Sequence, residues 1–247
     1  MIKIGIGIIT YNRLSRLKRL LKQIELTADE EYCLFVSDDN STDGTKEFLM
    51  KSNIPYFINK VNLGVAYTKN KALKYLEKCD YIFLIEDDTL FLKKGWMILY
   101  CKALKVSKLN FISFISNQHL KYDPNINEPI VTINSWSQGG INFEAKNFSG
   151  NYFCVYTKLC IKVAGGFNLQ FKGYGYAHNE FQDRITRLKL QKYHTVHLPK
   201  GEEYLDHDWT TISENNLEII QKRNEEYVEN EKVFNNLINL PPQKIIL

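Results

Sequence analysis

Short apolar runs alternate with helical patterns along the first hundred residues of this 247-residue chain. The runs that predict buried strands cover residues 2–9, 32–36, 55–58 and 81–85. The segments between them place apolar residues at helical spacing, as Leu17, Leu20 and Ile24 do after the first run. Strand and helix in this alternation predict an α/β fold with a right-handed, mostly parallel central sheet flanked by helices.

The fourth run ends abruptly in three acids, Glu86, Asp87 and Asp88. Ligands of open α/β sheets bind outside the carboxyl ends of the strands, so chemistry is expected there. Adjacent carboxylates repel one another unless a cation offsets their charge, and oxygen ligands suit Mg²⁺ or Mn²⁺. Alternation along a strand predicts Glu86 and Asp88 on one face and Asp87 on the other. A solvated acidic turn is the alternative.

Polar residues also follow the first two runs. Thr10-Tyr11-Asn12-Arg13 follows the first run, and an acidic loop that begins at Asp38 and Asp39 follows the second. Tyr11 is placed to lie against a nucleobase, while Asp38 or Asp39 accepts a hydrogen bond from a base or ribose. The alternative is that this loop only forms an Asx-turn and caps the next helix. For Arg13, contact with phosphates and neutralisation of the loop acids both remain open.

The third run leads into a glycine-containing loop and a helix. Asn62 and Gly64 suit a tight loop at the edge of a nucleotide site, with Asn70 about one helical turn further on. For the neighbouring Lys69, a surface position is the favoured interpretation. No GxGxxG follows a strand, because Gly5 and Gly7 lie inside the first run, and no GxxxxGK[ST] occurs. Dinucleotide-binding and Walker-type ATPase folds are therefore excluded by these signatures.

TYNR, SDDNSTDG, NLGVAYTKN and EDD, in this order at four strand ends, resemble the motifs of family 2-type GT-A glycosyltransferases. The resemblance covers about the first hundred residues, and a weaker match, GGFN followed by GYGYAHNEFQDR, extends it towards residue 187. It implies an enzyme that uses Mn²⁺ or Mg²⁺ and a nucleoside diphosphate-sugar donor, with a UDP-sugar favoured. We accordingly predict a GT-A domain over residues 1–212, divided into a nucleotide-sugar-binding half (1–100) and an acceptor-binding half (101–212).

The resemblance also assigns roles. The residues that it places at the nucleotide are Thr10, Tyr11, Arg13, Asp38, Asp39, Asn62, Gly64, Asn70 and Asp87. Asp39 matches the acid that reads the base in the family. Asp88 is the expected metal ligand, with Glu86 beside it and His207 at a position resembling the C-terminal metal-binding histidine of the family. A structural role for His207 is equally open.

The segment from Tyr174 to Arg184 loosely resembles the WGxEDxD motif, in which a carboxylate of inverting relatives deprotonates the acceptor hydroxyl. His178 stands at or beside the position of that base, and Glu180 is the second candidate. An imidazole works as a general base near neutral pH, which favours His178 narrowly. The alternative is a helix start whose polar residues cap the helix. On the acceptor side, Trp136 and Tyr152 are candidates to contact a sugar ring, although a core tryptophan is nearly as well supported.

Composition adds limits to this picture. A net charge of +4 is mild, and no recognised motif accompanies it, so no nucleic-acid partner is expected. The basic cluster over residues 13–22 predicts a solvated helix face. The more specific alternative is contact with an anionic membrane surface. Five cysteines without CxxC spacing and an N-terminus without a secretory pattern predict a cytoplasmic enzyme, peripheral at the inner face of a membrane if it binds one.

The last part of the chain, residues 213–247, is predicted as a charged helical extension packed on the domain and ending in a loose tail. Its uneven apolar face leaves a homodimer contact open. The acceptor is expected to be a saccharide or a lipid-linked saccharide. Two alternatives to this enzyme remain: a non-catalytic nucleotide-sugar-binding scaffold, and a sugar nucleotidyltransferase, which would ordinarily carry a glycine-rich loop after the first strand.

Overall fold

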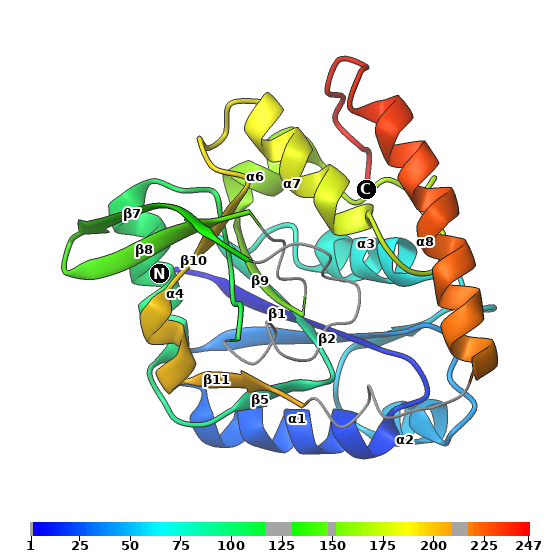
Figure 1. Cartoon of the computed structure of the whole chain (residues 1–247). Coiled ribbons are helices and arrows are strands. Elements are labelled where there is room, and N and C mark those ends of the chain that lie inside the picture. Colours follow the sequence, from blue (N-terminus) through cyan, green and yellow to red (C-terminus); the bar gives the residue numbers. More distant parts are fainter. Residues whose placement is uncertain (1, 117–129, 148–151, 209–216) are drawn as a thin grey trace.

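A computed structural model of the chain describes residues 2–116, 130–147, 152–208 and 217–247. A nine-stranded sheet in the order β3-β2-β1-β4-β9-β6-β10-β8-β7 forms its centre, with helices on both faces (Figure 1). The first half of the chain contributes β1 (Ile4–Thr10), α1 (Leu14–Thr27), β2 (Tyr32–Asp38), α2 (Thr45–Lys51), β3 (Tyr56–Ile58), α3 (Val65–Tyr75), β4 (Tyr81–Glu86), β5 (Thr89–Phe91), α4 (Trp96–Ser107) and β6 (Phe111–Ser113). The second half contributes β7 (Thr132–Gln138), β8 (Ile141–Lys146), β9 (Phe153–Thr157), α6 (Lys158–Ala164), α7 (Ala177–Arg187), β10 (Thr195–His197), the 3₁₀-helix η1 (Pro199–Glu203), β11 (Leu205–His207) and α8 (Leu217–Leu237). The predicted α/β class and the four N-terminal strands are confirmed.

The first hundred residues build the parallel part of the sheet. β1 pairs in parallel with both β2 and β4, and β2 pairs in parallel with β3. β9 is antiparallel to both β4 and β6, so β6 runs in the same direction as β4. The carboxyl ends of β1, β2, β4 and β6 therefore lie along one edge of the sheet, where ligands of such sheets bind.

Two apolar cores hold the helices against the sheet. α1 and α4 pack on one face, and α3, α6, α7 and α8 cover the other, which is uppermost in Figure 1. The glycines inside β1 allow this packing: a Cβ on Gly7 would lie 2.9 Å from Cβ of Ala72 on α3. Gly5 and Gly7 thus serve the close approach of a helix to a strand, which explains glycines in a strand interior.

The C-terminal part of the chain packs on the upper face. Phe234 of α8 lies against the core, and Asn230 donates hydrogen bonds of 2.8 Å to the carbonyls of Lys172 and Tyr174. The sequence predicted that the final residues form a loose tail, and this is wrong. Ile245 forms a parallel bridge with the GGFN segment that begins at residue 165. Backbone hydrogen bonds there offset the entropy of ordering the tail.

Candidate active site

The acidic triplet lies at the end of β4, but the strand stops at Glu86. Asp87 and Asp88 form the turn that follows, where Arg13 Nη1 donates to Asp87 Oδ1 and to Asp88 Oδ2, both at 3.0 Å. Thr10 Oγ1 donates to Asp87 Oδ2 at 2.7 Å. The predicted alternation of the three acids is therefore wrong, since the chain turns after Glu86 and the two aspartates share one cation.

The two aspartates differ in electrostatics. Burial raises the pKa of Asp87 to about 6, although Arg13 favours its ionised form. Burial also acts to raise the pKa of Asp88, but His207 and then Arg13 outweigh it and hold that pKa below its usual value. Asp88 is thus the more strongly ionised of the pair and the better ligand for a cation. Arg13 thus pairs with Asp87 and Asp88 and not with the acids of the loop after β2, while its predicted contact with phosphates stays a prediction.

Pairing of two short strands brings His207 to Asp88. β11 lies antiparallel to β5 with His207 opposite Thr89, and Asp208 N donates to the carbonyl of Asp88 at 2.7 Å. His207 Nε2 consequently lies 3.4 Å from Asp88 Oδ1. That oxygen is buried, and among the described residues it has no hydrogen-bond partner. Two of the three residues predicted as metal ligands, Asp88 and His207, therefore lie side by side.

This pair fits a divalent cation. A buried carboxylate oxygen without a hydrogen bond and an adjacent imidazole nitrogen are donors that Mn²⁺ accepts. Within the described ranges, no group of three or more His, Cys, Asp or Glu side chains could hold a metal ion by itself. Further ligands would come from substrate phosphates and water, as is usual for such ions. Glu86 lies apart from this pair, because Lys69 holds it.

Tyr152 supports His207 instead of facing an acceptor. Its ring centroid is 4.3 Å from that of His207, and its side chain is buried. Its hydroxyl oxygen accepts a hydrogen bond of 2.7 Å from Ser116 N. A buried ring with an engaged hydroxyl offers no face to a sugar, so the acceptor role predicted for Tyr152 is replaced by a positioning one.

Trp136 lies on β7, at the far end of the sheet from β3. Its ring stacks with Phe143 at 5.3 Å and with Tyr193 at 5.4 Å between centroids. Aromatic stacking of this kind is characteristic of packing, so the structure supports the core interpretation of Trp136 over sugar stacking.

Two arginines of the basic cluster in α1 reach the rim of the site. Arg19 Nη1 lies 2.6 Å from Asp208 Oδ2, and Arg16 Nη2 lies 3.7 Å from the same oxygen. Asp208 directly follows His207, so these cations help to fix the end of β11. For Arg16 and Arg19 the expectation of a purely solvated helix face is wrong.

Asp39 shapes the loop that precedes α3. Its Oδ1 accepts from Leu63 N at 2.8 Å and from Asn59 Nδ2 at 2.7 Å, while Oδ2 accepts from Gly64 N at 2.8 Å. Gly64 has a φ of +86°, and a Cβ there would lie 2.8 Å from Gly173 N, so only glycine fits. Asn59, which the sequence analysis missed, completes this arrangement.

The other predicted nucleotide residues divide into two groups. Asp38 is buried and accepts hydrogen bonds from the backbone N–H and the hydroxyl of Ser41, so the Asx-turn alternative describes it. Tyr11 is 44% exposed, and Asn62 is also exposed, which leaves both side chains accessible to a ligand.

Asn70 holds the GGFN segment against α3. Its Nδ2 donates to the carbonyl of Phe167 at 2.8 Å, and Phe167 N donates to its Oδ1 at 2.7 Å. Both ends of the amide are thus engaged by one backbone unit. The nucleotide contact predicted for Asn70 is not what this geometry shows.

Lys69 is fully buried, and its predicted surface position is wrong. Its Nζ lies 2.6 Å from Glu86 Oε1 and 2.5 Å from His178 Nε2. A buried ammonium needs such partners, because an unpaired charge in the interior is costly. The sequence did carry a signal: Lys69 stands three residues after Ala66 and four before Leu73, on the apolar face of α3.

His178 lies in the first turn of α7, where its ring packs 5.0 Å from that of Phe167. Burial first, and the Lys69 ammonium second, lower the pKa of His178 well below 6.5. The imidazole is therefore neutral at pH 7. Lys69 donates to Nε2, so the ring proton belongs on Nδ1, which has no hydrogen-bond partner in the described part of the chain.

Glu180, two residues further along α7, is held by Arg184. Arg184 Nε donates to Oε1 and Nη2 to Oε2, both at 2.8 Å, and Nη2 also reaches the carbonyl of Gly166 at 2.8 Å. Bidentate pairs of this kind fix geometry as well as charge. Glu180 thus ties α7 to the GGFN segment, and the sequence analysis missed Arg184 as its partner.

Comparisons with known proteins agree with this geometry. The model of the family described as Glycosyl transferase family 2 matches residues 6–105. A curated relative from Campylobacter jejuni, GalNAc(5)-diNAcBac-PP-undecaprenol beta-1,3-glucosyltransferase, is 25% identical over 189 residues, which is 70% of this chain and 57% of the relative.

Solved structures share the fold. The S. aureus TarS 1-349 structure in complex with UDP has a TM-score of 0.58 and 18% identity, covering 83% of this chain and 60% of that one. Mannosyltransferase PcManGT from Pyrobaculum calidifontis, in complex with GDP-Man and Mn²⁺, has a TM-score of 0.61 and 13% identity, covering 98% and 66%. The chain spans less than two thirds of the length of each of these three proteins. Together, the findings show that the chain has the GT-A fold of these solved structures and that residues 6–105 are similar to glycosyl transferase family 2.

Proposed function

We propose that this protein is a metal-dependent glycosyltransferase that moves a sugar from a nucleoside diphosphate-sugar to a hydroxyl of a saccharide or lipid-linked saccharide. The observation that carries the proposal is the Asp88–His207 pair, with its buried carboxylate oxygen, at the carboxyl edge of the parallel strands. Mn²⁺ or Mg²⁺ bound there would stabilise the negative charge of the departing diphosphate.

We favour uracil as the base of the donor, which makes the donor a UDP-sugar. Asp39 organises the loop at the nucleotide edge and matches the base-reading acid of the resembled family, while Tyr11 offers an exposed ring beside it. The titles of the TarS and PcManGT structures name UDP and GDP-Man, so guanosine donors form the natural comparison in any test.

For the chemical step we propose inversion with His178 as the general base. Glu180 is the weaker candidate, because Arg184 engages both of its oxygens. His178 is neutral, which is the form that accepts a proton, and its lone pair lies on the nitrogen that Lys69 faces. The acceptor hydroxyl would therefore take the place of Lys69 at Nε2, while Glu86 continues to hold the ammonium.

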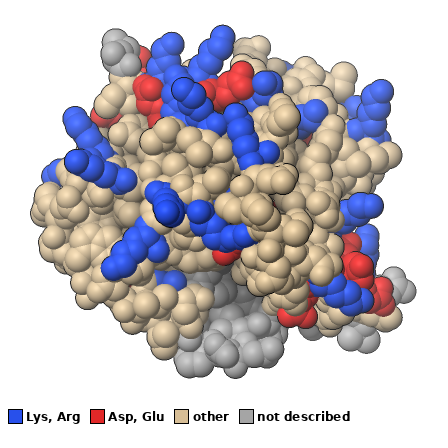
Figure 2. Space-filling view, turned by 90° about the horizontal axis from the view of Figure 1, so that it is seen from above, with Lys and Arg blue, Asp and Glu red and all other residues tan. Residues whose placement is uncertain are grey.

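For location we propose a cytoplasmic enzyme that contacts the inner face of a membrane peripherally. The name of the curated relative includes an undecaprenol-linked substrate, which supports a lipid-linked acceptor here. Lys and Arg side chains are spread over the face that α3, α6, α7 and α8 form (Figure 2). None of the helices in the described ranges combines the length and apolarity that a bilayer crossing requires. A homodimer remains a further proposal.

A donor screen tests the function directly. The full chain would be incubated with UDP- and GDP-sugars and Mn²⁺, with release of the nucleoside diphosphate as the readout. We expect a UDP-sugar to give UDP, and excess EDTA to stop the release. Binding of nucleotide-sugars without release under any condition would instead support a non-catalytic scaffold, and pyrophosphate formation from a sugar phosphate and a nucleoside triphosphate would support a nucleotidyltransferase.

The role of Asp39 has its own test. Asp39→Ala removes the acceptor that holds Leu63 N and Gly64 N, so the Kd for UDP should rise by roughly 10- to 100-fold, the scale for hydrogen bonds to a charged group. At saturating donor, kcat should change little, since a uniform binding contact is lost. Titration calorimetry measures the affinity, and Asp80→Ala at the opposite edge of the sheet is the control. Unchanged UDP affinity in Asp39→Ala would exclude a uridine site there.

A further inference from the structure

A cavity of about 200 Å³ lies in the second half of the sheet, between the end of β6, β8, β10 and η1. Side chains of both charges and of apolar character line it: Ile115, Ser116, Glu144, Lys146, His197 and Glu202. Neither Asp88 nor His207 lines this cavity, so it is a separate site for a ligand.

The cavity adjoins the Asp88–His207 pair, called the metal pair below, through Ser116. Ser116 Oγ donates to Asp206 Oδ1 at 3.2 Å, and Asp206 directly precedes His207. Ser116 N also bonds the hydroxyl of Tyr152, whose ring contacts His207. β10 runs parallel to β6, so both strands end at the same sheet edge as β4. A molecule in this cavity would therefore lie beside the metal pair.

The chemistry of the walls is polar but nearly balanced in charge. Lys146 Nζ lies 2.6 Å from Glu144 Oε2, so these two charges cancel. His197 Nδ1 accepts a hydrogen bond of 3.3 Å from Ile115 N, which assigns the ring proton to Nε2 and makes that atom a donor. Burial, and then Lys146, lower the pKa of His197 to about 4, so the ring is neutral. Glu202 adds one negative charge.

We propose that this cavity binds a neutral sugar ring of the acceptor, an inference that rests on the proposed glycosyltransferase function. Carboxylates accept from hydroxyl groups, while Lys146 and the His197 ring donate to them. Ile115 supplies an apolar wall for the C–H face of the ring. The volume is below the roughly 300–1,000 Å³ of pockets for larger ligands, which suits one ring. The lining holds two carboxylates and one ammonium group, which disfavours a phosphate, so the diphosphate of a lipid-linked acceptor would stay outside.

Saturation-transfer NMR on the full chain tests this inference. UDP and Mg²⁺ would fill the donor site, and the probes would be methyl β-glycosides of glucose, galactose, N-acetylglucosamine and N-acetylgalactosamine, with glucose 1-phosphate as the anionic counterpart. We expect at least one glycoside to bind and glucose 1-phosphate to bind more weakly. The Kd of that glycoside should rise at least tenfold in Glu202→Gln and in Lys146→Met.

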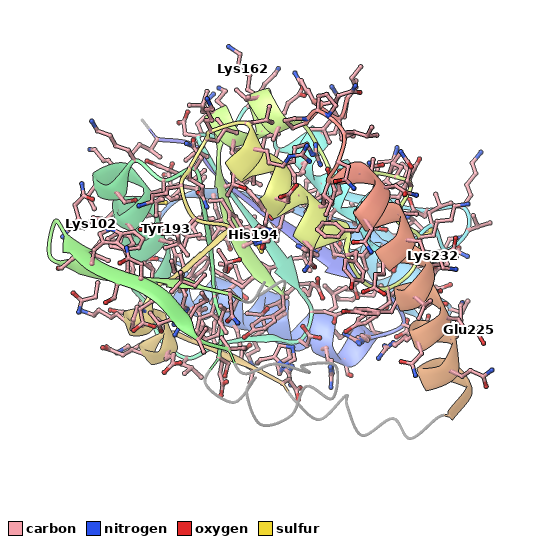
Figure 3. All side chains as sticks on the ribbon, turned by 45° about the horizontal axis from the view of Figure 1, so that its top comes forward. Lys102, Lys162, Tyr193, His194, Glu225 and Lys232 are labelled. Carbon is pink, nitrogen blue, oxygen red and sulfur yellow. The ribbon has the colours of Figure 1, made fainter. Side chains whose placement is uncertain are left out.

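The control is Lys102→Met, on α4 (Figure 3), because Lys102 lines a separate cavity of about 240 Å³ with Gly95 and Tyr204. Glycoside binding should be unchanged in this variant. Three results would each overturn the inference: no glycoside binding, a glycoside affinity in both cavity variants equal to that of the unmodified protein, or tighter binding of glucose 1-phosphate. Titration of UDP alone separates the two proposals, since a failure of UDP to bind rejects the proposed function, whereas UDP binding without glycoside binding rejects only this one.

Discussion

Replacement of Asp88 by alanine should lower the rate of sugar transfer by roughly 10³-fold, which corresponds to about 4 kcal/mol of transition-state stabilisation. Asp88 Oδ1 is buried, has no hydrogen-bond partner among the described residues and lies beside His207. Asp88→Ala therefore removes the stronger of the two metal donors. Release of nucleoside diphosphate from the donor, measured over a range of Mn²⁺ concentrations, gives the rate. His207→Ala should cause a smaller loss that higher Mn²⁺ partly restores.

Glu203→Ala is the matched control, because Glu203 lies two residues before β11, is exposed and pairs only with Lys93 in the described part of the chain. It should transfer sugar at the rate of the unmodified protein. Undiminished turnover in Asp88→Ala, or in excess EDTA, would contradict the metal proposal. Thermal unfolding of each variant shows whether a loss of activity reflects a loss of fold.

The second large effect is expected at His178. His178→Ala should lower kcat by roughly 10²–10⁴-fold with donor binding nearly intact, the usual scale for a general base. Glu180→Gln should lower kcat less but reduce thermal stability, because it weakens the buried pair with Arg184. The reverse ranking of the two rates would move the base to Glu180. Near-normal rates in both variants would make this segment a structural helix start.

The pH profile gives an independent test of the same base. His178 has a pKa lowered by burial and then by Lys69, so the active, neutral form persists below pH 6.5 and is lost only as the pH falls through that lowered pKa. The acidic limb of kcat should therefore lie below the ordinary imidazole range that the sequence alone suggests. Lys69→Met removes a cation and should move the limb to higher pH, whereas Lys71→Met, in the same helix, should not. An unchanged limb in His178→Ala would assign it to another group.

The sequence predicted the first hundred residues well because their signals are local. Each strand is a short apolar run, and each helix repeats apolar residues at helical spacing. Asp39 and Asp88 follow strands of a parallel sheet, in which the carboxyl ends lie at one edge. Even there, the position where β4 stops was missed, since alternation assumes that the strand continues through the acids.

The contacts that the sequence did not reveal are those between distant segments. Apolar periodicity shows which face of α3 is buried, but not that Lys69 on that face meets Glu86 and His178. Asn70 and Tyr152 are polar or aromatic residues at ligand-like positions, and only their tertiary partners show that they hold backbone or a neighbouring ring. Such partners are set by how helices dock on the sheet, which propensity and spacing do not encode.

The pairing of β5 with β11 fixes when the site can exist during synthesis. All four N-terminal motifs leave the ribosome early, because the N-terminal part of a chain is synthesised first. Asp88, however, gains His207 only after residue 207 has emerged, and contacts of such long sequence separation form late. A nascent chain stalled before β11 would therefore carry its acidic turn without its imidazole, and we expect metal-dependent nucleotide capture to begin only once that strand has cleared the exit tunnel.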